Sequence, residues 1–144
     1  MKDSLEVSKF YIHDVESSNV VENGYSFVSP FFLPAGDVYV YIDSRYIGSF
    51  PFTETLEEES VEMMIGPTSS VSCISVIEKT EEKTKITTKI YNKTNEDIDL
   101  TIKYYVGKNA ITSIPPYTER INDKLEWDLT VDNSQEYLFE VELL

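Results

Sequence analysis

The stretch Ile98-Asp99-Leu100-Thr101-Ile102-Lys103-Tyr104-Tyr105-Val106 alternates apolar and mostly polar side chains along its length. Successive side chains of a β-strand point to opposite faces of the sheet, so this segment would bury one face and leave the other in water. The segments 38–42, 125–131 and 137–143 repeat the alternation. Strands of this kind are typical of antiparallel sheets with one wet face. They predict an all-β fold, an antiparallel β-sandwich.

Three further segments, 61–65, 71–78 and 84–91, also have the composition of strands. The segment 71–78 is apolar on both faces near its middle, which favours a central position in its sheet. Residues 54–64 include helix-forming side chains, but four glutamates between positions 57 and 62 would crowd a short helix. We therefore expect an acidic loop there that leads into a strand.

Turn residues separate the predicted strands at Asp43-Ser44, 92–96 and 132–135. Asn and Asp suit such places because they tolerate a left-handed backbone and bond to their own main chain. Near the N-terminus, 9–15 and 25–32 look extended, and Asn23-Gly24 between them is typical of a hairpin turn. With no linker and no internal repeat in view, we expect residues 1–144 to form a single domain.

The net charge of −14, from 26 acidic and 12 basic residues, limits the choice of partners. A field of this sign repels phosphate backbones and anionic lipid surfaces, so we expect no nucleic-acid partner. Solubility is the simplest role of the charge, and a basic partner or a cation site is the alternative. No apolar run approaches the length of a membrane span, and the first residues lack the apolar core of a signal peptide.

Few residues are available for catalysis or for holding a cofactor. The single histidine, His13, excludes a zinc site with two His ligands, and we expect it on the surface or on an edge strand. The single cysteine, Cys73, lies in a strand segment and is predicted to be buried and inert, which fits a reducing, cytoplasmic location. The five glycines are scattered, so no phosphate-binding loop is present. We therefore expect no catalytic residue, no metal and no cofactor.

Acidic side chains form two clusters, Glu57, Glu58, Glu59 and Glu62 in one and Glu126, Asp128 and Asp132 in the other. A glycosidase pair or a calcium site could be drawn from such residues. However, Glu126 and Asp128 lie at strand spacing opposite Trp127, which is the pattern of a solvated strand face. The first cluster does not have the spacing of an EF-hand loop.

Two surface features remain for binding. Tyr39 and Tyr41 would share a face opposite Val38 and Val40, with Tyr46 just across the turn, and an open face there would be a small aromatic patch. The alternative is that both faces of this sheet are covered. Almost half of the basic residues form a second group, Lys79, Lys83, Lys85, Lys89 and Lys93, which we interpret as a charged edge that resists strand pairing.

The stretch Leu33-Pro34-Ala35-Gly36-Asp37-Val38-Tyr39-Val40-Tyr41-Ile42-Asp43-Ser44-Arg45-Tyr46-Ile47-Gly48 resembles a known family, the C-terminal domain of unknown function of mucoidy inhibitor A-like proteins. Later parts of the pattern follow in order, at Ile90-Tyr91-Asn92 and at Leu125-Glu126-Trp127-Asp128-Leu129. The family's Asp-Gly turn is Asp43-Ser44 here. The resemblance covers about 31–144 and implies an immunoglobulin-like domain without catalytic residues, to which 1–30 would add N-terminal strands.

We therefore expect a non-enzymatic interaction or structural module. Binding would use the face of Tyr39, Tyr41 and Tyr46, an exposed sheet edge, or both, toward a protein partner or in self-association. A carbohydrate hydrolase built on surface carboxylates is one alternative, and calcium-dependent binding is another.

Overall fold

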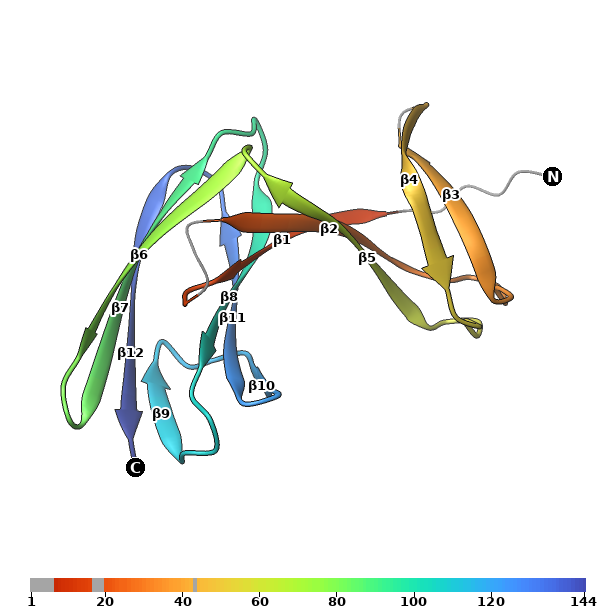
Figure 1. Ribbon diagram of the computed structural model, residues 1–144. Helices are drawn as coiled ribbons and strands as arrows, with labels where there is room; N and C mark the ends of the chain where they lie inside the picture. The colour runs from red at the N-terminus through yellow and green to blue at the C-terminus, as the bar shows by residue number, and fades with distance from the viewer. Residues whose placement is uncertain (1–6, 17–19, 43) are drawn as a thin grey trace. The chain divides into compact units, whose positions relative to one another are not determined.

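The computed structural model describes residues 7–16, 20–42 and 44–144. Within these ranges the chain forms twelve β-strands and no helix, which confirms the all-β prediction (Figure 1). The strands are β1 (Ser8–Asp14), β2 (Val21–Val28), β3 (Gly36–Ile42), β4 (Arg45–Phe52), β5 (Ser60–Thr68), β6 (Val71–Lys79), β7 (Lys83–Asn92), β8 (Ile98–Tyr105), β9 (Ile111–Ile114), β10 (Glu119–Ile121), β11 (Lys124–Val131) and β12 (Gln135–Leu143).

The chain divides into two compact units. The smaller unit includes Gly24–Met64, and the larger one consists of Lys9–Asn23 and Ile65–Leu144. Each unit has buried apolar side chains of its own. That residues 1–144 form one domain stays a prediction.

Two sheets account for the larger unit, with the strand orders β10-β11-β8-β1-β2-β5 and β6-β7-β12-β9. Parts of β2 and β5 belong to the smaller unit. The prediction of purely antiparallel sheets is wrong at one place, because β1 pairs with β8 in parallel, with Tyr11 opposite Leu100 and Asp14 opposite Lys103. Side chains alternate with the same period of two in both kinds of sheet, so the sequence pattern could not distinguish them.

The two sheets of the larger unit share one apolar core. Its largest fully buried side chain is Trp127 on β11, whose ring lies 4.6 Å from the ring of Phe139 on β12, measured between centroids. Leu100 on β8 and Ile86 on β7 are also buried in it. These residues lie on the faces that the alternation predicted. Two sheets that face each other across a common core are consistent with the predicted β-sandwich.

The Asn23-Gly24 pair does not form the predicted hairpin turn, because both residues lie inside β2. The Asn23 side chain is buried, and its Nδ2 donates a hydrogen bond to the Gly66 carbonyl oxygen on β5 at 2.9 Å. This bond across the sheet replaces the local turn that an Asn-Gly pair favours. Strand β5 also runs through Gly66-Pro67 instead of ending before it, and Gly66 has φ of 126°.

Strand β6 lies at a sheet edge and not at the predicted central position, since its sheet has the order β6-β7-β12-β9. Its inward side chains Val71 and Cys73 are buried, whereas Ile74 and Val76 on its other face are exposed. The run is therefore apolar on both faces although only one face is covered.

The smaller unit contains the two-stranded sheet of β3 and β4. Register continues to Ile42 opposite Arg45, which leaves a two-residue connection as predicted, with Ser44 at φ of 63°. Asp43 lies outside the described residues. Leu33 and Thr55 exchange two backbone hydrogen bonds of 2.8 and 2.9 Å and close the base of the hairpin. The acidic segment before β5 is a loop, as expected.

Candidate functional site

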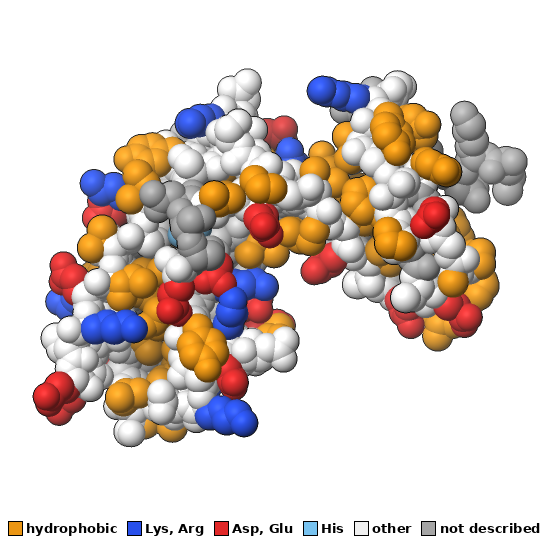
Figure 2. All heavy atoms as spheres, viewed as in Figure 1, with side chains coloured by type: hydrophobic (Ala, Val, Ile, Leu, Met, Phe, Trp, Pro, Cys, Tyr) orange, Lys and Arg blue, Asp and Glu red, His pale blue; other side chains and the backbone are white. Residues whose placement is uncertain are grey.

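The three tyrosines predicted to bind a partner are exposed on the β3–β4 hairpin. Tyr39 is 67% exposed, Tyr41 63% and Tyr46 54%. Tyr41 and Tyr46 lie opposite each other in the register, and their ring centroids are 5.4 Å apart at an interplanar angle of 57°. In Figure 2, hydrophobic side chains gather over this hairpin on the face turned to the viewer. We call Tyr39, Tyr41 and Tyr46 the tyrosine face.

A β-bulge brings Tyr46 onto this face. Val40 lies opposite Gly48, but the next residue, Tyr41, lies opposite Tyr46, so Ile47 is the extra residue on β4. Directly opposed residues of an antiparallel pair point to the same side of the sheet. Without the extra residue, Tyr41 would face Ile47 and Tyr46 would point to the other side. The alternation predicted Tyr39 and Tyr41 on one face, but it gave no signal for the bulge.

The base of the hairpin is held by hydrogen bonds that involve a buried polar residue. Thr55 is 6% exposed, pairs with Leu33 through the main chain, and its Oγ1 donates to the Thr53 carbonyl oxygen at 3.1 Å. A face that is anchored at its base loses less conformational entropy when it binds than a free loop would lose.

The prediction of a surface or edge position for His13 is wrong. His13 is fully buried on β1, which lies between β8 and β2. Its Nδ1 lies 3.3 Å from the Val20 carbonyl oxygen, and its Nε2 lies 3.2 Å from Ser75 Oγ on β6. Because a carbonyl oxygen can only accept, Nδ1 carries the proton and Nε2 accepts from Ser75. Loss of hydration lowers the His13 pKa below 6.5, so the ring is neutral.

Ser75 continues this buried polar chain. Its Oγ lies 2.7 Å from the hydroxyl of Thr88 on β7, which is itself fully buried. The chain from Val20 through His13 and Ser75 to Thr88 connects the two sheets of the larger unit. The Nδ1 proton goes to a main-chain oxygen and not to a carboxylate, so this Ser–His pair differs from the hydrolase triad, in which an Asp orients the ring.

Cys73 lies on β6 as a free, fully buried thiol, which confirms the predicted burial. Burial raises the pKa of its thiol to about 12. A thiol in that state is not a nucleophile near neutral pH, because the thiolate is the reactive form.

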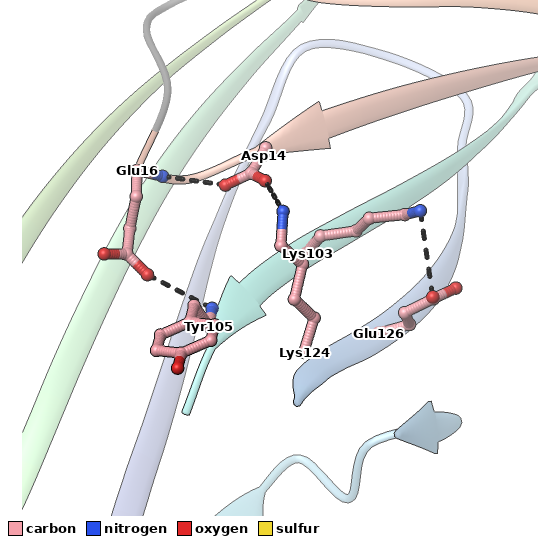
Figure 3. Close-up of polar contacts among 6 residues, drawn as sticks. All are labelled: Asp14, Glu16, Lys103, Tyr105, Lys124 and Glu126. Atoms are coloured by element: carbon pink, nitrogen blue, oxygen red, sulfur yellow. Dashed lines mark hydrogen bonds and ion pairs between the residues drawn. The ribbon is translucent and has the colours of Figure 1, made fainter. Parts of the chain in front are cut away.

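Three carboxylates of the larger unit, Asp14, Glu16 and Glu126, take part in a polar ladder across β1, β8 and β11, shown in Figure 3. Asp14 forms an ion pair with Lys124, and Lys103 forms another with Glu126 at 3.8 Å. Glu16 Oε1 accepts a hydrogen bond from the Tyr105 backbone N–H at 3.1 Å. Each charge of these two pairs is thus offset by a neighbour on the same face.

Asp128 confirms the solvated strand face that its spacing predicted, because it is exposed and accepts a 2.7 Å hydrogen bond from the Thr101 hydroxyl. In the other acidic cluster, Glu57, Glu58 and Glu59 lie exposed in the loop before β5, and Glu62 is exposed on β5 itself. Over the part of the chain that the structure describes, no group of three or more His, Cys, Asp or Glu side chains could hold a metal ion.

Sequence reasoning missed a cleft of about 280 Å³ in the larger unit. Its lining includes Tyr104, Ile111, Val141 and Leu143 with Glu81 and Glu82 of the β6–β7 turn. The lining comes from segments far apart along the chain, so no local pattern could have revealed it.

Comparison of the chain with protein-family models, with curated proteins and with solved structures returned no match. No helix that is long and apolar enough to cross a membrane occurs in the described ranges.

Proposed function

We propose that this chain is a non-enzymatic protein-interaction module that binds a protein partner through the tyrosine face. The observation that carries the proposal is the exposure of Tyr39, Tyr41 and Tyr46, each more than half exposed on one face of an anchored hairpin. Tyrosine offers a large, rigid apolar area with only two side-chain torsions, and its hydroxyl bonds to polar groups at the rim of an interface. Aromatic side chains of this kind often provide much of the binding energy at protein interfaces.

The chemistry of the partner follows from the same residues and from the net charge. A partner would present apolar pockets for the rings and hydrogen-bond acceptors for the three hydroxyls. The charge of −14 disfavours nucleic acid and anionic membranes, since both are polyanions. A protein surface of neutral or basic character is therefore the partner that fits.

The immunoglobulin-like arrangement and the kinship with mucoidy inhibitor A-like C-terminal domains belong to the same proposal. The stretch that carries the resemblance, 33–48, covers β3 and the first half of β4, and so it contains the whole tyrosine face. This coincidence supports a shared binding role for the hairpin. A cytoplasmic location is also part of the proposal, supported by the free thiol of Cys73.

A comparison of variants tests the tyrosine face. The full chain and its Tyr41→Ser/Tyr46→Ser variant would be used as baits, and captured proteins would be quantified by mass spectrometry and retested by titration with the purified partner. Tyr105→Ser is the matched control, because Tyr105 is also 54% exposed but lies on β8. We expect the double variant to weaken binding at least tenfold and the control to bind normally. Equal binding by all three proteins, with unchanged melting temperatures, would rule out the tyrosine face.

A further inference from the structure

The sheet edges of the described chain differ in how well they are protected against pairing with another strand. Strand β9 has four residues and is followed by Pro115, and β10 has three residues. Strand β5 contains Gly66 and Pro67. Short edges and prolines are the devices by which proteins avoid edge-to-edge association.

Strand β6 has none of these protections. It has nine residues, Val71–Lys79, without proline or glycine, and its register with β7 is unbroken from end to end. Its one neighbour in the sheet is β7. On its outward face Ile74 is 45% exposed and Val76 is 56% exposed. Of the lysines that we expected to guard this edge, only Lys79 is on β6, as its last residue, and the others lie on β7 or just after it. Lys89 on β7 is opposite Ile74, but it lies on the inner side of β6 and not at the free edge.

The sequence of β6 is complementary to itself in antiparallel pairing. If two copies meet with Ser75 opposite Ser75, Ile74 of one copy lies opposite Val76 of the other, and Val76 lies opposite Ile74. The four exposed apolar side chains then form one cross-strand cluster. In the same register Glu78 faces Ser72, and Lys79 faces Val71, so no like charges are opposed.

Charge also favours a contact at this place between two copies of so acidic a chain. The segment 71–93 contains five lysines and three glutamates, whereas the whole chain has a net charge of −14. Within the sheet, Glu78 on β6 lies opposite Lys85 on β7, so the negative charge of Glu78 is partly neutralised before a second copy approaches. Two copies that meet along this segment therefore repel each other less than the net charge of the chain would indicate.

We propose that β6 is a dimerisation edge, along which a second copy of this chain adds its own β6 in antiparallel orientation centred on Ser75. The two four-stranded sheets then form one continuous sheet. The observations that carry this proposal lie in the larger unit, so it is independent of the tyrosine face.

The oligomeric state of the full chain at graded dilution tests the proposal. Sedimentation or light scattering is expected to show a dimer that dissociates on dilution. Val76→Lys places a charge on the apolar cluster at an exposed position, and it is expected to weaken dimerisation at least tenfold. Leu138→Lys is the matched control, because Leu138 on β12 is 52% exposed on the same outward face but away from the edge. This control is expected to dimerise like the unmodified chain.

The register is tested separately by the double variant Ile74→Cys/Val76→Cys under mild oxidation. Peptide mapping is expected to find a disulfide between position 74 of one copy and position 76 of the other. A chain that stays monomeric at high micromolar concentration would overturn the proposal. So would a dimer that survives Val76→Lys, or a dimer lost only in Tyr41→Ser/Tyr46→Ser, since the latter places the contact on the tyrosine face.

Discussion

The imidazole Nε2 of His13 on β1 lies 3.2 Å from the hydroxyl oxygen of Ser75 on β6, and the His13 side chain is fully buried. These two residues are 62 positions apart in the chain and belong to opposite sheets. With the neutral ring, Nε2 accepts this hydrogen bond from the Ser75 hydroxyl, whereas a doubly protonated ring would have to donate it and would carry a buried charge. The contact between the two sheets is therefore linked to the protonation state of one side chain.

Stability is expected to fall as the pH drops below about 6.5, and His13 is the cause. The folded-state pKa of His13 lies below its unfolded value of 6.5, mainly because of burial, although the Val20 carbonyl and the nearby Asp14 oppose the shift. Above pH 6.5 the His13 ring is neutral in both the folded and the unfolded chain, so its titration does not lower the free energy of unfolding. Between pH 6.5 and the lower folded-state pKa, His13 takes up a proton in the unfolded state but not in the folded state. Each pKa unit that separates the two states lowers the free energy of unfolding by about 1.4 kcal/mol. Urea unfolding at several pH values measures the loss.

His13→Gln separates this effect from the many carboxylates, which also titrate in acid. The variant is expected to be less stable at pH 8 but to lose less stability between pH 7 and 5 than the unmodified chain. Parallel curves for the two proteins over that interval would contradict the assignment to His13.

Phe139 and Leu138 are adjacent on β12, but their side chains have opposite environments. Phe139 is fully buried with its ring tilted against that of Trp127, while Leu138 is 52% exposed. Phe139→Ala is expected to lower the free energy of unfolding by about 3–5 kcal/mol, because it leaves a cavity in the shared core. Leu138→Ala is expected to change it by no more than about 0.5 kcal/mol. Similar losses for both variants, measured by urea unfolding, would contradict the two-sheet core.

The main strands and their buried faces could be predicted from the sequence because the signal is local. The alternation in 98–106 and 125–131 assigns Leu100 and Trp127 to the core without knowledge of any partner strand. The loop before β5 and the close connection of β3 to β4 were also predictable, since turn and acidic residues act over a few positions.

The errors arose where distant contacts decide the structure. His13 lies in a segment with apolar side chains on both faces, so its burial depends on Ser75 far along the chain. Asn23-Gly24 has the composition of a turn, but the bond from Asn23 to Gly66 holds it in a strand. The middle of β6 is apolar on both faces, as in a central strand, but its outer face is uncovered. The exposure of the three tyrosines on one hairpin was predictable, but the alternation of the sequence did not indicate the bulge at Ile47.

The ion pair between Asp14 and Lys124 is expected to contribute a small, salt-dependent stabilisation. Both side chains are partly exposed, 24% and 38% respectively, so water and ions screen the pair. Asp14→Asn keeps an oxygen that can accept from the Glu16 backbone N–H but removes the charge. We expect a loss of about 0.5–1 kcal/mol at low salt that shrinks in 1 M salt. Asp97→Asn, at an exposed turn carboxylate, serves as control and should cost less.

Cys73 is expected to resist thiol reagents in the folded protein. Its side chain is fully buried and its pKa is raised to about 12, so the thiolate is scarce and the reagent has no access. A colorimetric disulfide reagent at pH 8 should react with less than one tenth of the thiol in the native chain and with all of it in urea. A Leu138→Cys variant supplies the matched control, because Leu138 lies on β12 of the same sheet, away from the β6 edge, and its side chain is 52% exposed. In that variant one thiol per chain should react at once and the second only after unfolding. Rapid reaction of Cys73 in the native chain would show that β6 opens readily and would contradict the buried position of its inward face.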